Sequence, residues 1–331
     1  MIKAGIIGTG IGLKHYEAIN NYRGSKVVCI LEKNLKKIRI LKKKFKKVDF
    51  VNNEKSFFNR KDINFISIAS HDEDHYSQII KAIKKKSSIL VEKPVCLNFQ
   101  ELKKINSLTK KKEVNFSSNL VLRENSLFLN LKRKIKKKDV YYIEADYLWG
   151  RKEKLFDWRS KTKQYSLTLG AAIHMLDLVC WLLNSKPISV FSKSNYKITK
   201  NTKFKKFSFA TYLFTFPDDI LVKISADGVC VHPHFHKIKI FEKNQTFISN
   251  ISGQYQIKKK NDKKFDIKKV NYNYPDKKNR KKLIRGFIDS IIDKKKFQLT
   301  KKSIIDLMTA CLFADESLKK KKEITIKYFN D

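Results

Sequence analysis

Residues 2–15 read Ile-Lys-Ala-Gly-Ile-Ile-Gly-Thr-Gly-Ile-Gly-Leu-Lys-His, an apolar stretch that runs directly into a group of glycines. The apolar part is typical of a buried strand, and the glycines stand where that strand would turn into a helix. Glycine permits a tight turn and lets backbone N–H groups approach a pyrophosphate, whose charge is favoured at a helix N-terminus. We therefore expect a dinucleotide-binding turn made by Gly8, Thr9, Gly10, Ile11, Gly12 and Leu13.

The glycine spacing is Gly-x-Gly-x-Gly, one residue shorter than the usual fingerprint, so an ordinary strand-to-helix turn stays open as the alternative. Support comes from Glu32, which ends the second apolar run about twenty residues after the glycines. A carboxylate there accepts both ribose hydroxyls and repels a 2′-phosphate, which favours NAD. Lys33 beside it weakens the preference, so NADP also stays open, and Glu32 could instead simply begin a helix.

The alternation of strand and helix continues to about residue 118. Apolar, β-branched runs at residues 2–7, 27–31, 63–69, 88–91 and 114–117 are separated by lysine-rich amphipathic stretches. This pattern is typical of a parallel sheet covered by helices on both faces. We predict an α/β protein whose residues 1–120 form a doubly wound Rossmann domain that binds NAD(P).

The pattern changes after Leu122. A chain of 331 residues is long enough for two cores, since single domains usually stop growing near about 250 residues. Helical spacing is found at residues 125–135, 171–183, 281–292 and 303–319, and strand patterns at 141–149, 207–216, 220–226, 236–241 and 245–251. We predict that residues 121–331 form an α+β domain with a large, mostly antiparallel sheet, which serves substrate binding and oligomerisation.

The charge of the chain is extreme, with 73 Lys and Arg against 32 Asp and Glu, and a net charge of +41. Most of the basic residues form short lysine runs near expected helix ends and loops, which favours a solvated surface. Polyanion binding is the alternative, because ammonium groups release counterions from phosphate backbones. No zinc-finger, basic-zipper or RNA-binding signature is present, so we expect no specific nucleic-acid partner.

The five cysteines are far apart and odd in number, and they form neither a Cys-x-x-Cys pair nor a disulfide framework. Free thiols favour a reducing compartment. The chain begins directly with a strand pattern, and no apolar run approaches the ~20 residues of a membrane span. We expect a cytoplasmic protein without a membrane partner.

Five further motifs together carry a family resemblance. They are Ser70-His71-Asp72-Glu73-Asp74-His75, Val91-Glu92-Lys93-Pro94, Asn119-Leu120-Val121-Leu122-Arg123, Asp157-Trp158-Arg159 and Gly170-Ala171-Ala172-Ile173-His174-Met175-Leu176-Asp177. In this order, with the glycine turn, the chain resembles the Gfo/Idh/MocA oxidoreductases over essentially its whole length. Each motif alone is weak, whereas Glu-Lys-Pro at a strand end with a downstream His-x-x-Asp on a helix is quite specific.

The resemblance implies a catalytic set of Lys93, His174 and Asp177. It places Lys93 beside the nicotinamide, where an ammonium can stabilise the alkoxide character that develops as hydride leaves. His174 is then the proton carrier, because an imidazole titrates near about pH 6.5, and Asp177 supports it. The same resemblance adds further cofactor-binding residues, namely Ser70, His71, His75 and Glu92. A surface lysine, a core histidine and a helix-packing aspartate are the alternatives.

Two arginines are candidate substrate ligands alongside Lys93 and His174. Arg159 could grip a carboxylate or phosphate through its guanidinium fork, or form a structural ion pair. Arg123 has the same two interpretations, and its family position lies near the domain junction. The family commonly has an Asp four residues before the histidine, where this chain has Gly170. That departure leaves the mechanism open and suggests room for a bulkier substrate.

Three histidines alternate in His232-Pro233-His234-Phe235-His236. Such a set can bind zinc, but Pro233 disfavours an interior ladder, no acidic ligand is near, and hydride transfer needs no metal. We expect no metal, and we expect His236 either to face the substrate or to pack in the core.

Taken together, the sequence predicts an NAD(P)-dependent dehydrogenase that acts on a CH–OH group of a sugar, nucleotide sugar or cyclitol. Because an open antiparallel sheet face needs cover, we expect a homodimer or homotetramer. Two rival functions stay open. The first is a dinucleotide-binding sensor or scaffold without turnover, and the second is a polyanion-binding protein.

Overall fold

The computed structural model describes residues 1–162, 164–261, 264–270 and 278–329, and it consists of two compact units. The first unit holds Met1–Glu124 and Lys277–Ile305, and the second holds Asn125–Asp276 and Asp306–Asp331. This division differs from the expected single segment 121–331. The reason is packing, because α10 (Asn279–Ile292) lies against α1 (Gly12–Ile19) and buries Leu283, Ile284, Phe287 and Ile288.

The first unit contains a six-stranded sheet in the order β3-β2-β1-β4-β5-β6. Its strands are β1 (Ile2–Ile7), β2 (Ser25–Leu31), β3 (Asp49–Val51), β4 (Phe65–Ile68), β5 (Ser88–Val91) and β6 (Phe116–Ser118). All neighbouring pairs are parallel, so the predicted doubly wound sheet is confirmed. The sequence pattern missed β3, because three residues show no periodicity.

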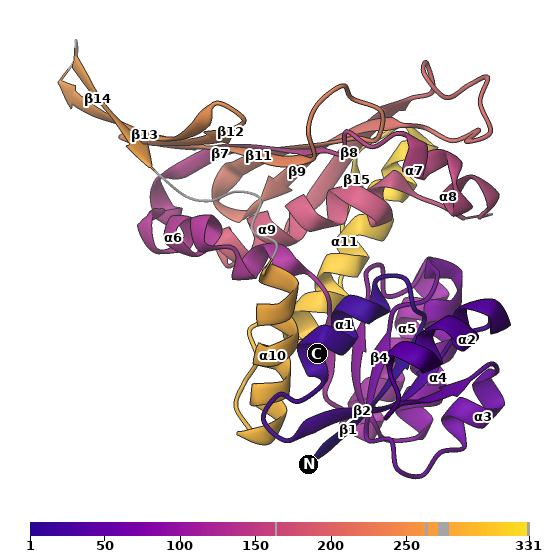
Figure 1. Cartoon of the computed structure of the whole chain (residues 1–331). Coiled ribbons are helices and arrows are strands. Elements are labelled where there is room, and N and C mark those ends of the chain that lie inside the picture. The colour runs from indigo at the N-terminus through magenta and orange to yellow at the C-terminus, as the bar shows by residue number, and fades with distance from the viewer. Residues whose placement is uncertain (163, 262–263, 271–277, 330–331) are drawn as a thin grey trace. The chain divides into compact units, whose positions relative to one another are not determined.

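Helices surround this sheet (Figure 1). Besides α1 and α10 they are α2 (Leu35–Lys44), α3 (Glu54–Phe58), α4 (Asp72–Lys84), α5 (Phe99–Lys112) and the 3₁₀ turn η1 (Val121–Glu124). Asparagine begins three of them, since the side chains of Asn34, Asn53 and Asn98 each accept a backbone N–H of the first turn. The strand order reverses between β1 and β4, and ligands of such sheets bind beyond the carboxyl ends of the strands at this point.

The second unit contains a nine-stranded sheet in the order β14-β13-β12-β11-β7-β10-β9-β8-β15. The bounds of its strands are β7 (Val140–Leu148), β8 (Ser189–Asn195), β9 (Phe209–Phe216), β10 (Ile220–Asp227), β11 (Phe235–Glu242), β12 (Gln245–Asn250), β13 (Gly253–Asn261), β14 (Lys264–Val270) and β15 (Ile324–Thr325). Only the pair β7–β10 is parallel among the pairings of these strands. The predicted mostly antiparallel sheet is therefore confirmed.

Helices of the second unit lie on one side of its sheet, as α6 and α9 show in Figure 1. The helical segments are α6 (Ser126–Lys134), η2 (Lys137–Asp139), α7 (Glu153–Phe156), α8 (Trp158–Lys161), η3 (Thr168–Ala172), α9 (Ile173–Leu183), η4 (Pro217–Asp219) and the long α11 (Lys301–Lys320). The expected helix 171–183 is thus longer, because one π-helical turn, η3, precedes α9. π-helical turns are rare and are frequently found at functional sites.

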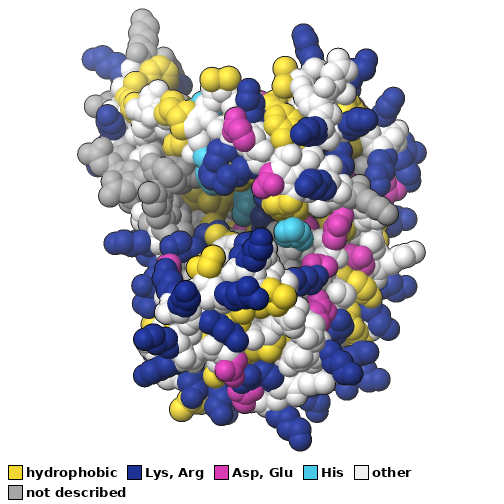
Figure 2. All heavy atoms as spheres, turned by 45° about the vertical axis from the view of Figure 1, so that its right-hand side comes forward, with side chains coloured by type: hydrophobic (Ala, Val, Ile, Leu, Met, Phe, Trp, Pro, Cys, Tyr) yellow, Lys and Arg dark blue, Asp and Glu magenta, His cyan; other side chains and the backbone are white. Residues whose placement is uncertain are grey.

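The lysines lie on the surface, as Figure 2 shows, where Lys and Arg side chains are spread over the visible face with acidic side chains among them. Several lysine runs end helices, for example Lys42 to Lys44 in the last turn of α2 and Lys110 to Lys112 in the last turn of α5. Cations there complement the helix dipole. Among the described helices, none is both long enough and apolar enough to cross a membrane.

Candidate active site

The glycine turn joins the end of β1 to the start of α1. Gly8 has φ +90°, and a Cβ there would stand 2.5 Å from the carbonyl oxygen of Ala69, so only glycine fits. A Cβ on Gly10 would meet nothing within 4 Å, which leaves the outer side of the turn open for a ligand. Gly12 begins α1 and packs closely on Ile6, where a Cβ would approach to 3.1 Å. Gly8 thus permits the turn, Gly10 leaves space for a ligand, and Gly12 allows the close contact between helix and strand.

Glu32 follows β2 and lies next to this turn. Its carboxylate accepts a hydrogen bond from the hydroxyl of Thr9 and another, at 2.9 Å, from the backbone N–H of Asn34. These two bonds fix the carboxylate beside the glycines without burying it, since Glu32 is half-buried. The neighbouring Lys33 lies 3.5 Å from Asp74 in an exposed ion pair. Glu32 thus lies beside the glycine turn, and its role as a ribose ligand stays a prediction.

The ends of β4 and β5 bring in the remaining candidates of the first unit. Ser70 donates its hydroxyl to Gln78 at 2.7 Å, and His71 is exposed at the start of α4. Lys93 follows β5 and is half-buried. All three stand at the carboxyl edge of the sheet, Ser70 and His71 after β4, which flanks the reversal of strand order, and Lys93 after the next strand, β5.

Glu92 is fixed by groups that the sequence analysis did not identify. His15 donates its Nε2–H to Glu92 at 3.0 Å, and the Nδ2 of Asn119 donates at 2.5 Å. Arg280 adds an ion pair at 3.7 Å. Burial alone would raise the pKa of Glu92, but the bond and charge of His15, the charge of Arg280 and the bond of Asn119 lower it to about 2. A permanently ionised carboxylate thus directly precedes Lys93.

His75 lies on α4 and is completely buried. Its Nδ1–H donates to the carbonyl of Pro94 at 2.7 Å, and its Nε2 lies 3.3 Å from the carbonyl of Ser70. The imidazole therefore ties the residue after Lys93 to the end of β4. This contact gives His75 a positioning part in the loop, and the cofactor contact that the sequence predicts for it stays a prediction.

In the second unit, His174 belongs to a cluster of rings that we call the ring cluster: Tyr147, Trp149, His174, His234 and His236. The imidazole of His174 stacks on Tyr147, with centroids 5.7 Å apart and planes 11° apart. Tyr147 also contacts His234 at 5.2 Å, His236 at 5.0 Å and Trp149 at 6.3 Å between centroids. Residues from β7, β11 and α9 thereby meet on one side of the sheet.

His236 on β11 and His234, just before that strand, are neutral at physiological pH. Burial and the nearby Arg151 charge lower the pKa of His234 to about 4, and burial, His234 and Arg151 lower that of His236 well below its ordinary value. Burial raises the pKa of Tyr147 to about 12, against the opposing charges of Arg151 and Arg159. The ring cluster therefore offers neutral hydrogen-bonding groups and ring faces.

Of the three alternating histidines, the structure brings two to His174. The ring of His236 lies 6.2 Å from that of His174, and His234 lies 4.9 Å from His236. His232 instead contacts the carbonyl of its neighbour Pro233 at 2.7 Å. No group of His, Cys, Asp and Glu side chains suited to a metal ion is found within the described residues, so the zinc alternative gains no support.

The remaining candidates differ in their surroundings. Arg159 lies over the rings of Trp149 and Trp158, with its Cζ at 5.0 and 4.3 Å from their centroids. Asp177 is buried in α9, and its charge contributes to the raised pKa of Cys311 on α11. Arg123 belongs to the first unit, where it is buried and donates to the carbonyl of Gln298 at 3.2 Å. That bond indicates a structural part for Arg123.

Tyr165 occupies the space beside Gly170. A Cβ at residue 170 would overlap the Tyr165 hydroxyl, so the glycine is what admits this ring, which also packs edge-on against Phe204 at 5.5 Å. Residues 170 and 174 are four apart and share a helix face. Tyr165 therefore lies on the face that carries His174, a feature that no sequence motif indicated.

Asp315 on α11 holds the start of the same helical segment. Its carboxylate accepts the hydroxyls of Ser166, at 2.9 Å, and of Thr168, which also bonds to the hydroxyl of Tyr212 at 2.7 Å. Burial raises the pKa of Asp315 to about 6, although both hydroxyls and the Lys319 charge lower it. The π-helical turn before His174 is thus anchored by a titratable carboxylate.

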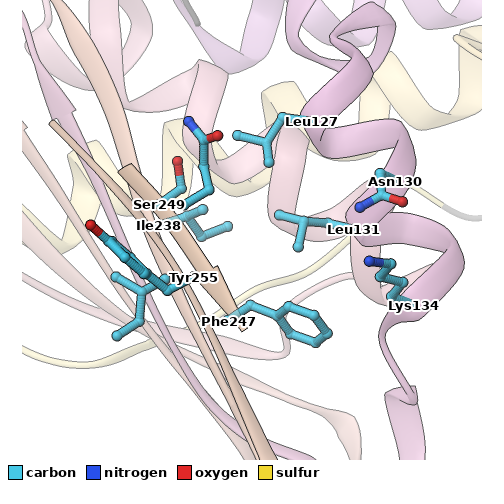
Figure 3. A pocket seen from close by; sticks show the side chains of 10 residues that line it. Leu127, Asn130, Leu131, Lys134, Ile238, Phe247, Ser249 and Tyr255 are labelled. Atoms are coloured by element: carbon cyan, nitrogen blue, oxygen red, sulfur yellow. The ribbon is translucent and has the colours of Figure 1, made fainter. Parts of the chain in front are cut away.

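A cavity of the second unit lies elsewhere, between α6 and strands β11 to β13 (Figure 3). Leu127, Leu131, Ile238 and Phe247 make its lining apolar. It shares no residue with the ring cluster, and we assign it no part in the site.

Solved structures cover this chain from end to end. Scyllo-inositol dehydrogenase from Lactobacillus casei, with bound NAD(H) and scyllo-inositol, matches with a TM-score of 0.81 at 16% identity, over 98% of both chains. Levoglucosan dehydrogenase in complex with NADH matches with a TM-score of 0.85 at 14% identity, over 99% of this chain and 100% of that one. UDP-N-acetylglucosamine 3-dehydrogenase from Acidithiobacillus ferrooxidans matches with a TM-score of 0.80 at 16% identity, over 97% and 98%. At these identities the likeness shows the fold.

Sequence comparisons assign the family. The comparison with curated proteins finds no matching sequence. Two family models match in chain order. Residues 2–120 match the model described as an oxidoreductase family with an NAD-binding Rossmann fold, and residues 137–248 match the GFO/IDH/MocA C-terminal domain. With both halves of the pattern present, the chain belongs to the Gfo/Idh/MocA family of NAD-binding oxidoreductases.

Proposed function

We propose that the protein is an NAD(P)-dependent dehydrogenase that transfers a hydride between nicotinamide and a ring carbon of a sugar, nucleotide sugar or cyclitol. The observation that supports it most is the loop after β5. Lys93 follows a carboxylate held by His15, Asn119 and Arg280, and it precedes a carbonyl held by His75. A solvated surface lysine does not require fixed neighbours, whereas an ammonium that binds a reacting oxygen must be held in position.

The first unit fits a dinucleotide. The open side of Gly10, the start of α1, where the N-cap residue Ile11 makes no side-chain cap, and the carboxylate of Glu32 match a pyrophosphate followed by a ribose. Gly8 to Leu13 would hold the phosphates, Glu32 the ribose hydroxyls, and Ser70, His71 and Lys93 the nicotinamide end. When bound, NAD supplies the hydride acceptor or donor.

Lys93 and His174 have different roles toward the substrate hydroxyl. The Lys93 ammonium donates a hydrogen bond to the oxygen on the reacting carbon and stabilises its developing negative charge. The His174 imidazole accepts the hydroxyl proton during oxidation and returns it during reduction. Stacking on Tyr147 holds the plane of that imidazole in one orientation. Asp177, buried one turn later on α9, would support the imidazole electrostatically.

The ring cluster supports a polyhydroxylated ring as substrate. Neutral His234 and His236 can donate hydrogen bonds to the hydroxyl groups of such a ring or accept hydrogen bonds from them. Tyr147 and Trp149 are buried, and His174 and Arg159 already lie over their rings. The three solved relatives carry scyllo-inositol, levoglucosan and UDP-N-acetylglucosamine in their names. All three are polyhydroxylated rings or contain one.

Initial rates of NADH formation with a panel of sugars, nucleotide sugars and inositols test the proposal. For the best substrate, Lys93→Met and His174→Gln should each lower kcat by about 10²–10³, the usual loss for a transition-state donor or a proton carrier. Lys84→Met, which removes an exposed charge from α4, is the matched control and should leave kcat unchanged. Equal turnover by Lys93→Met and Lys84→Met would remove Lys93 from the mechanism.

One observation favours a second function, a dinucleotide-binding sensor or scaffold without turnover. The Tyr165 hydroxyl takes the space of a side chain at residue 170, one turn before His174. The same panel separates the two functions. Tight NADH binding with no activity on any member would favour the sensor, and turnover with one member would exclude it.

The open sheet face of the second unit supports a homodimer or homotetramer. Leu213 and Leu221 are 42% and 39% exposed on β9 and β10, and Tyr142 stacks on Phe241 beside them. Ion pairs such as Glu144–Lys239, at 3.1 Å, lie on the same strands. Light scattering should show an oligomer that Leu213→Glu with Leu221→Glu dissociates, and a monomeric parent protein would contradict this.

A further inference from the structure

Arginine is scarce in this chain, which makes its positions informative. Only nine of the 73 basic residues are arginine. Arg23, Arg60 and Arg280 hold carboxylates, at 2.8, 2.7 and 3.7 Å. Arg151 and Arg159 form no ion pair within the part of the chain that the structure describes, as is also true of Arg39, Arg133 and Arg285. Their location sets Arg151 and Arg159 apart, because Arg159 lies over Trp149 of the ring cluster and the charge of Arg151 acts on His234 and His236.

Arg159 is held in a way that presents its edge. Its guanidinium lies over Trp149 at 5.0 Å and over Trp158 at 4.3 Å, so the aromatic rings contact its face. One of its N–H groups donates to the carbonyl of Lys154 at 3.3 Å. A guanidinium has five N–H donors in a planar fork, and the fork matches a carboxylate or phosphate. Stacking on the rings fixes the plane of that fork before any ligand arrives.

Arg151 and Lys154 add charge at the same place. Arg151 lies close enough to His234 and His236 to lower the pKa of both, after the larger effect of burial. Burial, Arg151 and Arg159 together lower the pKa of Lys154. The three cations therefore repel one another, and no described carboxylate compensates them. An anion bound among them would relieve this repulsion.

The three cations adjoin the proposed reaction site. Arg159 contacts Trp149, Trp149 contacts Tyr147 at 6.3 Å, and Tyr147 stacks on His174 at 5.7 Å. The chain of ring contacts runs from the guanidinium to the imidazole within the second unit. A ligand whose reacting hydroxyl lies at His174 can therefore extend an acidic group toward Arg159.

We propose that the substrate of this enzyme is an anionic sugar or cyclitol, whose carboxylate or phosphate is bound by Arg159 and Arg151 beside the ring cluster. The inference rests on the proposed dehydrogenase function and names its substrate class. The shared chemistry is a planar or tetrahedral oxyanion. A sugar acid, a sugar phosphate and a nucleotide sugar all supply it.

Matched pairs of ligands test the inference by calorimetry in the presence of NADH at 0.15 M salt. The pairs are glucose with glucuronate, glucose with glucose 6-phosphate, and N-acetylglucosamine with UDP-N-acetylglucosamine. At least one anion should bind ten times or more tightly than its neutral partner. The pair with the largest ratio identifies the source of the oxyanion. Equal affinity within every pair would overturn the inference.

Two variants distinguish anion binding at Arg159 from the attraction of anions by the net positive charge of the protein. Arg159→Met keeps the apolar stem of the side chain. It should lower the affinity for the anionic ligand at least tenfold, while the affinity for the neutral partner stays the same. Lys152→Met removes an exposed charge from the same segment and should leave the preference intact. Equal losses in both variants would assign the preference to bulk electrostatics and overturn the proposal.

A third variant and a kinetic readout complete the test. Arg151→Gln keeps the Trp149 and Trp158 contacts of Arg159, so it stays informative if Arg159→Met folds poorly. In turnover assays the loss should fall on KM for the anionic substrate rather than on kcat. Because calorimetry needs no hydride transfer, a preference for anions without turnover would support this inference while contradicting the dehydrogenase.

Discussion

At the end of β1 the chain makes its binding site from backbone, whereas around His174 it uses side chains. Gly8, Gly10 and Gly12 matter because they lack a Cβ, and what they offer is N–H groups at a helix start. The ring cluster instead depends on five rings from β7, β11 and α9. A backbone site tolerates only glycine, so it is sensitive to a single added carbon. A side-chain site can change its members, and with them its substrate.

The same contrast appears in two carboxylates. Glu92 in the first unit has a pKa of about 2, because His15, Arg280 and Asn119 favour its charged form against burial. Asp315 in the second unit has a pKa raised to about 6 by burial, because two hydroxyls and Lys319 compensate it less. Ionisation of Glu92 thus stabilises the first unit, whereas ionisation of Asp315 destabilises the second unit.

The largest effect is expected at the glycine turn. Gly8→Ala adds a Cβ 2.5 Å from the Ala69 carbonyl at φ +90°, so we expect a loss of about 2–3 kcal/mol in unfolding free energy and of NADH binding by over about a hundredfold. Thermal unfolding and calorimetry measure both. Gly10→Ala, with nothing within 4 Å, should weaken NADH binding but leave stability unchanged. Similar melting losses in both variants would contradict the backbone account.

Glu92→Gln should cost on the order of 2–3 kcal/mol at pH 7, because His15 and Arg280 lose their carboxylate. The folded pKa of about 2 lies below the unfolded value, so the Glu92 contribution is present above about pH 4.5 and is lost as the pH falls toward 2. Urea unfolding between pH 3 and 7 should therefore show a shallower decline in the variant. Glu17→Gln, at an exposed pair with Lys14, is the control. Parallel curves for all three proteins would contradict the pKa assignment.

Gly170→Ala tests the side-chain site. The new methyl group overlaps the Tyr165 hydroxyl, so we expect a loss of about 1–3 kcal/mol from overpacking and a lower kcat through displacement of the His174 helix face. Tyr165→Phe removes the overlapping oxygen, so the double variant should recover part of the stability. Additive losses in the double variant would show that the two positions do not interact.

The smallest effect is expected for Asp315→Asn, and its sign is opposite to that of Glu92. A folded pKa of about 6, above the unfolded value, means that ionising Asp315 costs stability, so the parent protein loses on the order of 1–2 kcal/mol as the pH rises from about 4 to 6. The asparagine variant should lack this decline. Glu316→Gln, the next residue on α11 and paired with Lys320, is the control and should keep it. A decline of equal size in Asp315→Asn would refute the assignment.

Sequence patterns reach the residues of the glycine turn more easily than the residues that surround His174. The turn at Gly8 to Leu13 and Glu32 are local in sequence, and their place follows from strand order alone. His15 precedes Glu92 by 77 residues, and Asn119 follows Glu92 by 27 residues. No periodicity of the sequence indicates that such distant residues are in contact. The family resemblance pointed to His174, but Tyr147 and His236 meet it only through packing of β7 and β11, and Tyr165 and Asp315 contact only the segment before its helix.

The fold shows a similar division. The apolar strands β1 and β5 were predicted at their observed bounds. The short β3 was missed, and the helix α10 was assigned to the second domain because it follows that domain in sequence. Its packing against α1 depends on a contact between the two ends of the chain, which a pattern of residues along the chain does not reveal.

The most direct test of the whole account is calorimetric titration of the purified protein with NADH and NADPH. The account predicts one site per chain with micromolar or tighter affinity for at least one of them, and loss of that site in Gly8→Ala. Absence of binding for both nucleotides by a folded protein would contradict the dinucleotide turn and the proposed dehydrogenase with it.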